Sequence, residues 1–290
     1  MSKNKKGLLI CNHFLQSEKF SDIYFFLLEA AKRQNVELTL TTNANLSTKS
    51  LETVATSYDF GIFWDKDILL AQQLELAGMQ LFNTSASIGK ADNKALSYIA
   101  LKKAELPMPV TIIAPKTFPN IGYTDLSFLQ DVEEKLGFPM VLKECYGSFG
   151  QQVYCIKNRQ ELIEKVKKLA DRPLLFQSLI HASYGKDVRI NVVGGKVVAS
   201  ILRYSTNGDF RSNLTLGGSM EAYQPSYAEI QVALASVSAL GLAFGGVDIL
   251  FGEQGPLVCE VNSNAHFATT LACTGINMAD EIIHHIITQQ

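Results

Sequence analysis

Two strand-like runs near the end of the chain constrain its fold more than any other feature. Residues 246–251 and 256–261 are apolar and β-favouring, and they flank Gly252-Glu253-Gln254-Gly255. Two β-favouring runs separated by a short glycine-bearing segment are typical of an antiparallel hairpin. We expect this hairpin to have its turn centred near Gln254, which sets which residues of the two strands face each other.

Centring the turn there places Asp248 directly opposite Glu260 on one face of the hairpin, with Asn262 two residues further along the same face. Two opposed carboxylates repel by roughly 0.2–1 kcal/mol in a sheet, and by more when buried among apolar neighbours such as these. A hard cation removes that conflict, and Mg²⁺ binds one or two protein carboxylates together with substrate phosphates. The pattern therefore predicts a metal site; the alternative is an exposed hairpin face with ordinary acids.

A glycine loop forms the second feature. Lys143 ends one predicted strand, residues 140–143, and Gly147-Ser148-Phe149-Gly150 lead into the next, residues 152–156. Glycines let backbone N–H groups approach phosphate oxygens, and a lysine adds a positive charge. The loop joins strand to strand, so it is not a Walker A loop. Taken alone, this motif is more typical of a plain hairpin turn.

A row of polar residues forms the third feature. Asp187, Arg189 and Asn191 share one face of a predicted strand, and Arg203 ends the strand that returns from Gly194-Gly195. Arg211 and Asn213 follow. Guanidinium groups bind phosphates and carboxylates through paired hydrogen bonds, so the set indicates an anion site. For any single arginine, an ordinary surface position is the alternative.

The rest of the chain predicts an α/β protein of three lobes. The first ninety residues alternate strands with helices, as in a small parallel sheet, but the turn after the first strand has no glycine to admit a dinucleotide. Residues 83–92 are rich in Asn, Ser, Thr and Gly and read as a linker. We expect an N-terminal lobe at residues 1–90, a central lobe at 91–177 and a C-terminal lobe at 178–290.

Composition excludes several classes of function. A net charge of −2 and the absence of a long Lys/Arg run argue against nucleic-acid binding. No apolar run approaches the ~20 residues of a membrane span, and no signal-peptide core is present. Five scattered cysteines without a CxxC pair suit reduced thiols in the cytoplasm. The oligomeric state stays open, with a homo-oligomer among the alternatives.

These motifs together resemble the ATP-grasp fold, specifically its RimK-type branch of ribosomal protein S6–glutamate ligase-like enzymes. The resemblance extends from about residue 83 to the C-terminus, and each motif is modest alone but specific in combination. The matching stretches are 138–153 (FPMVLKECYGSFGQQV), 175–193 (LFQSLIHASYGKDVRINVV), 210–218 (FRSNLTLGG) and 245–264 (GGVDILFGEQGPLVCEVNSN).

The resemblance implies a role for each matching position. It implies that nucleotide is bound by Lys94 and Lys143, by the mobile loop Gly147, Ser148, Phe149 and Gly150, by the adenine hinge Gln177, Ser178, Leu179 and Ile180, by Asp187 at the ribose, and by Arg211, Ser212 and Asn213 along the phosphates. It further implies metal ligands at Asp248, Glu260 and Asn262, catalytic arginines at Arg189 and Arg203, and substrate contacts at Asn264 and His266.

Two positions depart from the family pattern. The hinge has Gln177-Ser178 where relatives often have Gln-Glu, and Ala265-His266-Phe267 replaces a common Pro-Gly turn. These departures affect substrate identity more than ATP chemistry, and an ordinary loop histidine is the alternative for His266.

The expected activity is therefore ATP-dependent ligation of a carboxylate to an amine through an acyl phosphate. The resemblance implies ATP and Mg²⁺ or Mn²⁺, with two ions, as cofactors, and a small-molecule or peptide carboxylate and an amino acid as substrates. Glutamate or another amino acid would be added to a peptide, a protein terminus or a small molecule. An ATP-grasp kinase and a non-catalytic ATP-binding module are the alternatives.

Overall fold

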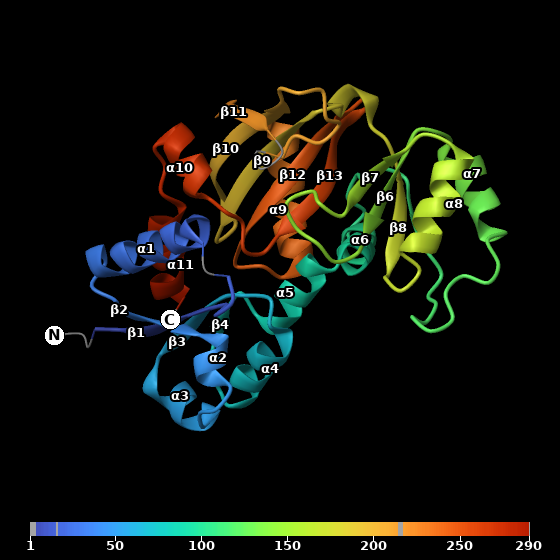
Figure 1. Cartoon of the computed structure of the whole chain (residues 1–290). Helices are drawn as coiled ribbons and strands as arrows, with labels where there is room; N and C mark the ends of the chain where they lie inside the picture. The colour runs from blue at the N-terminus through green and yellow to red at the C-terminus, as the bar shows by residue number, and fades with distance from the viewer. Residues whose placement is uncertain (1–3, 16, 214–216, 290) are drawn as a thin grey trace.

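Three β-sheets, each with its own helices, make up the protein (Figure 1). The structure is a computed structural model that describes residues 4–15, 17–213 and 217–289. The mixed α/β architecture agrees with the fold class predicted from the sequence. The three lobe boundaries at residues 90 and 177 stay a prediction.

The N-terminal sheet is parallel, with strand order β2-β1-β3-β4. Its strands are β1 (Lys6–Cys11), β2 (Glu37–Thr42), β3 (Phe60–Trp64) and β4 (Leu81–Phe82), and its helices are α1 (Glu18–Arg33), α2 (Asn43–Leu46), α3 (Leu51–Ser57) and α4 (Ile68–Leu76). The chain moves outward from β1 in one direction to β2 and in the other to β3. The order therefore reverses between β1 and β3, as in doubly wound sheets.

The segment predicted to be a linker is instead mostly helical. Helix α5 (Ser85–Asp92) begins where Thr84 accepts a hydrogen bond from the Ser87 N–H, and α6 (Lys94–Lys103) follows directly. The prediction was wrong because a Thr at the N-cap overrides the loop-like composition that follows it. Asn83 is also buried, and its side chain bonds the backbone of Phe244 and Ser263.

The central sheet is antiparallel, with strand order β5-β8-β6-β7. Its strands are β5 (Thr111–Ile113), β6 (Met140–Glu144), β7 (Val153–Ile156) and β8 (Leu174–Ser178), with helices α7 (Phe128–Leu136) and α8 (Arg159–Lys168). Leu129, Val132, Leu162 and Val166 pack these helices onto the sheet. The opposite face is left to meet α6 and the C-terminal lobe (Figure 1).

The C-terminal sheet is also antiparallel and has the order β11-β10-β9-β12-β13. Its elements are η1 (His181–Ser183), β9 (Lys186–Val193), β10 (Lys196–Ser205), β11 (Gly218–Ala222), α9 (Tyr227–Leu240), β12 (Phe244–Gly252), β13 (Gly255–Asn262), α10 (Ala268–Thr274) and α11 (Met278–Gln289). Val188, Ile190, Val247 and Ile249 pack against α9. Because strand residues alternate between faces, Asp187, Arg189, Asn191 and Asp248 lie on the opposite, polar face.

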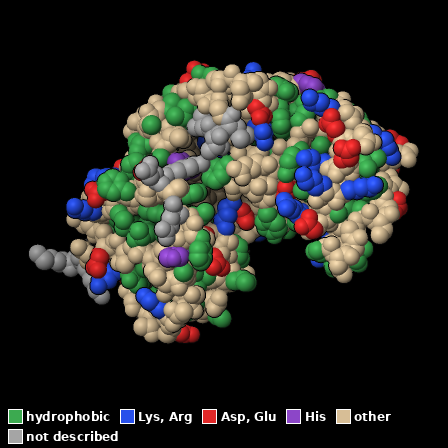
Figure 2. Space-filling model, viewed as in Figure 1, with side chains coloured by type: hydrophobic (Ala, Val, Ile, Leu, Met, Phe, Trp, Pro, Cys, Tyr) green, Lys and Arg blue, Asp and Glu red, His purple; other side chains and the backbone are tan. Residues whose placement is uncertain are grey.

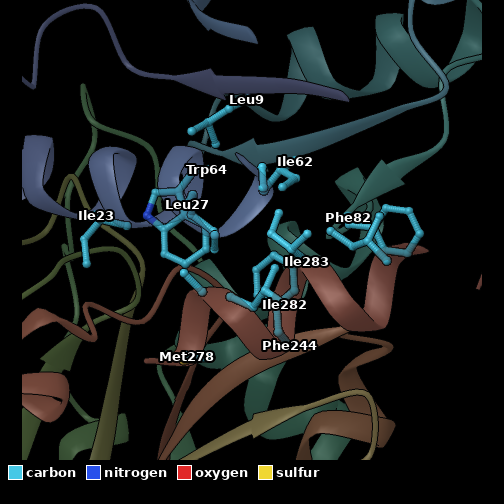
Figure 3. Close-up of a cluster of buried hydrophobic side chains, with 14 of the residues drawn as sticks. Leu9, Ile23, Leu27, Ile62, Trp64, Phe82, Phe244, Met278, Ile282 and Ile283 are labelled. Carbon is cyan, nitrogen blue, oxygen red and sulfur yellow. The ribbon is translucent and has the colours of Figure 1, made fainter. Parts of the chain in front are cut away.

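The last helix joins the two ends of the chain. Ile282 and Ile283 of α11 face Ile62 and Trp64 of β3 (Figure 3), and Trp64 stacks on Phe244 of β12 with ring centroids 5.6 Å apart. This apolar cluster holds the N-terminal sheet against the C-terminal lobe. No helix in the described ranges combines the length and apolar character that crossing a bilayer demands.

Replacing Ile283 with Ala should lower the free energy of unfolding by about 2–5 kcal/mol, because the side chain is fully buried in this cluster. Leu76→Ala is the matched control, since Leu76 is 90% exposed, and should change stability by about 0.5 kcal/mol or less. Urea titrations measure both. Equal effects would contradict the packing described here.

Candidate functional site

A pocket lies between the central sheet, α6 and β13. It has charged and polar groups at one end and apolar side chains at the other. Its lining comprises Ala91, Lys94, Ser97, Tyr98, Leu101, Met108, Thr111, Lys143, Leu175, Gln177, Val258, Cys259 and Glu260. Of the residues predicted to bind ATP or metal, it brings together Lys94, Lys143, Gln177 and Glu260. An apolar slot with cations at its mouth suits a planar base carrying phosphates.

The two lysines reach this pocket from different elements. Lys143, at the end of β6, is buried, and its ammonium nitrogen lies 3.7 Å from the Cys259 sulfur. Lys94 is the first residue of α6, which Asn93 caps by accepting two backbone N–H bonds. The Lys94 Nζ lies 3.1 Å from the Gly147 carbonyl oxygen and 3.5 Å from a Glu260 carboxylate oxygen. Both charges therefore sit beside the glycine loop.

The glycine loop is held from two sides. Arg211 donates a 2.6 Å hydrogen bond to the Gly150 carbonyl, and a Cβ on Gly150 would lie 2.5 Å from the Asn213 side-chain oxygen. On the other side, the Ser148 hydroxyl is 3.3 Å from the Lys66 Nζ, and the Phe149 ring meets Phe20 edge-on. The loop is thus closed down against both neighbouring lobes, with Gly150 at φ +73°.

Residues predicted for the hinge and the phosphate contacts lie around this pocket. Gln177 donates to the Thr111 hydroxyl at 2.9 Å, and the Ser178 N–H donates to the Val110 carbonyl. Leu179 and Ile180 continue from β8 into η1. Ser212 is buried beside Arg211 and Asn213, while residues 214–216 of the FRSNLTLGG stretch lie outside the described residues.

The opposed pair Asp248 and Glu260 is confirmed, but its structural basis differs from the one predicted. The turn pairs Gly252 with Gly255, one position away from a turn centred on Gln254. That register alone would place Cys259, not Glu260, opposite Asp248. The register shifts between Asp248 and Ile249, so the bulged strand holds Cys259 as the extra residue and returns Glu260 to the face of Asp248. Asn262 then faces the same way.

Two buried acids and two buried arginines fill the polar face beside this pair. Asp187 and Arg203 are opposed across β9 and β10, and Arg189 is opposed to Asp248 across β9 and β12. Arg203 binds Asp187 through two hydrogen bonds and lies 3.0 Å from Asp248, which Arg189 also binds through two. Burial disfavours the charged carboxylate, but Arg189 and Arg203 outweigh it and lower the pKa of Asp248. The four charges balance.

This arrangement bears on two of the roles implied by the resemblance. The Asp187 carboxylate, expected at a ribose, is engaged by Arg203. Arg203 itself is held by two carboxylates, which raise its pKa despite burial. The structure therefore places Asp187 as the group that positions Arg203, and any contact of either residue with a ligand would have to share these ion pairs.

A magnesium ion fits the oxygen donors at the edge of this face. The Glu260 side chain is 30% exposed toward the pocket, and the buried Asn262 amide nitrogen has no hydrogen-bond partner. Rotating that amide would present its oxygen at the same place. A carboxylate and an amide oxygen, with Asp248 adjacent, are hard ligands of the kind Mg²⁺ takes. The residues that the structure describes hold no group of three His, Cys, Asp or Glu suited to a metal, because the third donor here is an amide.

Asn264 and His266 follow in the loop between β13 and α10. The Asn264 side chain reaches the N-terminal lobe, where its amide nitrogen donates a 3.0 Å bond to the Asp65 carbonyl. His266 is half-buried, and its partner is not a predicted ligand. Sequence reasoning missed Tyr98, Met108 and Cys259 as pocket residues. The helical spacing of Lys94, Ser97, Tyr98 and Leu101 was the available signal for the first of these.

On the face shown in Figure 2, acidic and basic side chains are intermixed, and a notch separates the central lobe from the N-terminal lobe. The fold and the pocket define a nucleotide-binding clamp in which three α/β lobes meet around two lysines, a glycine loop and a set of carboxylates. The model of the RimK-like ATP-grasp domain family matches residues 91–286, and the chain belongs to that family.

Individual relatives agree with this membership. An uncharacterised protein of Mycoplasma pneumoniae is 33% identical over 265 residues, covering 90% of this chain and 91% of that protein. Human N-acetylaspartylglutamate synthase A is 36% identical over 205 residues, which is 70% of this chain; the chain spans about half of the synthase, 51%. D-alanine–D-alanine ligase from Bacillus anthracis, solved with ATP, superposes with a TM-score of 0.74 at 18% identity, over 99% of this chain and 97% of that one.

The buried charge set yields a stability prediction. Asp248→Asn should lower the free energy of unfolding by about 3–5 kcal/mol at pH 7, because it leaves Arg189 and Arg203 short of buried negative charge. Since the folded pKa of Asp248 lies below 3.8, its contribution is present above that pH and is lost as the pH falls through the lower folded value. The difference between variant and parent should therefore shrink only below about pH 4.

Chemical unfolding at pH 7 and pH 3 measures this difference. Asp280→Asn removes an exposed ion pair with Arg33 and serves as the control, with an expected cost below about 1 kcal/mol. A cost for Asp248→Asn no larger than that of the control would show that the buried pairs carry no such energy.

Proposed function

We propose that the chain is an ADP-forming carboxylate–amine ligase that binds ATP in the pocket between the central and C-terminal lobes. The observation that carries this proposal is the convergence of Lys94, Lys143 and Glu260 at the polar end of one pocket, next to the glycine loop. An apolar slot would take the adenine, and Gln177 at its rim would mark the hinge. The phosphates would lie toward the lysines and the loop.

The chain's own residues would perform distinct parts of the reaction. Lys143 and Lys94 would neutralise phosphate oxygens, and Arg211, already bonded to Gly150, would keep the loop closed over them. Glu260, Asn262 and Asp248 would hold Mg²⁺ or Mn²⁺, which supplies charge neutralisation between phosphates when bound. Two ions stay part of this proposal. Closure of the loop would exclude water, which otherwise hydrolyses an acyl phosphate.

The chemistry would run in two steps. A substrate carboxylate oxygen forms a bond to the γ-phosphorus of ATP, and ADP leaves. The amine, having lost a proton from its ammonium form, then forms a bond to the acyl carbon, and inorganic phosphate leaves. Arg189 and Arg203 are the cations nearest to the proposed metal ligands on this face and would stabilise charge on the acyl group.

The human relative's name refers to synthesis of a glutamate compound, so L-glutamate is the first amine to test. The acceptor carboxylate is proposed only as a class, a small molecule or a peptide. A cytoplasmic location is supported by five cysteines that form no disulfide. A kinase would release a stable phosphorylated product without an amine, and a binding module would release no ADP. Screening amino-acid and carboxylate pools for ADP release, with products read by mass, separates the three.

Glu260→Gln should abolish amine-dependent ADP release while leaving the fold intact, because it removes the exposed carboxylate expected to ligate metal. Glu253→Gln, an exposed acid in the turn of the same hairpin, is the control and should retain full activity. Circular dichroism checks the fold of both. Full activity in Glu260→Gln would contradict the metal assignment.

Gly150→Ala should raise the KM for ATP at least about 10-fold, because its Cβ would collide with Asn213 and displace the loop. Gly195 is the matched control, since it has φ +74° and nothing within 4 Å of a Cβ. Both alanines pay a similar backbone cost of about 1–2 kcal/mol, so only a loop-specific effect separates them. Equal KM values for the two variants would argue that the loop does not cover the nucleotide.

A further inference from the structure

The carboxyl ends of β1 and β3 form a second polar site, on the N-terminal lobe. In open α/β sheets, ligands bind outside the carboxyl ends of the strands where the strand order reverses. Here that reversal falls between β1 and β3. Asn12 directly follows β1 and Asp65 directly follows β3, and the Asn12 amide nitrogen lies 3.1 Å from an Asp65 carboxylate oxygen.

Asp65 is a buried carboxylate without a cation. It is only 5% exposed, and no Lys or Arg of the described residues lies within ion-pair distance of it. Its partners are the Asn12 amide and the Lys66 backbone N–H, while the Lys66 side chain turns to Asp92 and Ser148. Burial, the largest influence, raises the pKa of Asp65. Asp187, Asp248 and Glu144 are also buried, but each is paired with arginine.

The facing loop of the C-terminal lobe presents a second unsatisfied acceptor. The Asn264 amide nitrogen is committed to the Asp65 carbonyl, which fixes the orientation of the amide. Its side-chain oxygen is therefore the other end, and this oxygen is buried with no hydrogen-bond partner in the structure. A buried acceptor left unmade costs about 1–3 kcal/mol, so its retention beside Asp65 points to a ligand that donates.

This site adjoins the proposed phosphate site on both sides. Asn264 is two residues beyond Asn262, so their Cα atoms are at most about 7 Å apart. Lys66, next to Asp65, contacts Ser148 of the glycine loop. A group bound between Asp65 and Asn264 would therefore lie within reach of an acyl group held at the metal and at Arg189.

We propose that Asp65 and Asn264 bind the ammonium group of the amine substrate and deliver its nitrogen to the acyl carbon, an inference that rests on the proposed ligase function. A carboxylate and an amide oxygen are acceptors only, and a primary ammonium group offers three donors and a positive charge. An anionic group would be repelled by Asp65. The N-terminal lobe thereby selects the amine, while the pocket of the other two lobes binds ATP.

Asp65→Asn removes the charge and keeps the shape of the side chain. With the best amine from the twenty common L-amino acids, it should raise the KM for that amine at least about 10-fold, the loss typical of a charge-assisted hydrogen bond. The KM for ATP should change less than about twofold. Hydroxylamine, largely uncharged at neutral pH, should trap the acyl phosphate at the parent rate, because the first step does not use this site.

Two readouts separate binding from a structural role. Neutralising an unpaired buried charge should leave Tm unchanged or higher, whereas a structural carboxylate would lower it. Asp59→Asn, an exposed acid at the opposite end of β3, is the control and should behave as the parent protein. An unchanged amine KM in Asp65→Asn, or an equal rise in the KM for ATP, would overturn the inference while leaving the ligase function standing.

A second experiment needs no variant. The 2-hydroxy acid that corresponds to the best amino acid lacks the ammonium group and should not compete with it at concentrations where the amino acid saturates. Competition with equal affinity would overturn the ammonium site. If the parent protein releases no amine-dependent ADP with any of the twenty amino acids, the proposed function fails, and the inference fails with it.

Discussion

The pairing of Asp248 with Glu260 is the constraint on which the site depends. It exists because a one-residue bulge at Cys259 corrects a turn that would otherwise send Glu260 to the apolar face. On that face Val247, Ile249 and Val258 pack against α9, so a carboxylate there would be buried without a partner. The bulge thus performs two tasks with one residue. It turns Glu260 toward Lys94, and it places the Cys259 thiol beside Lys143 at the pocket.

Charge is distributed over the three lobes by burial. On the C-terminal sheet, Asp187, Arg203, Asp248 and Arg189 are balanced, so this face is rigid and presents little net charge of its own. The lysines that would meet phosphate come from the central lobe and from α6. The N-terminal lobe adds the opposite sign through Asp65. A ligase that must bring an anionic acyl phosphate and a cationic amine together has use for both signs, placed on different lobes.

Much of this arrangement could be predicted from the sequence. Strong periodicity and paired glycines indicated the hairpins, and the spacing of Asp248, Glu260 and Asn262 indicated their shared face. The bulge could not be predicted, because no local pattern distinguishes Cys259 as the extra residue. Helix α5 was missed because the Thr84 cap is a single residue within a loop-like composition. Asp65 was missed for another reason: the strand order that makes it significant follows from contacts between residues far apart in the chain.

The most direct measurement of this account is a crystal structure with Mn²⁺ and a non-hydrolysable ATP analogue, read by the anomalous signal of the metal. The account predicts a manganese peak about 2 Å from oxygens of Glu260 and Asn262, with the base in the slot lined by Leu175, Gln177 and Val258. A metal peak away from Glu260, or a nucleotide outside this slot, would contradict it.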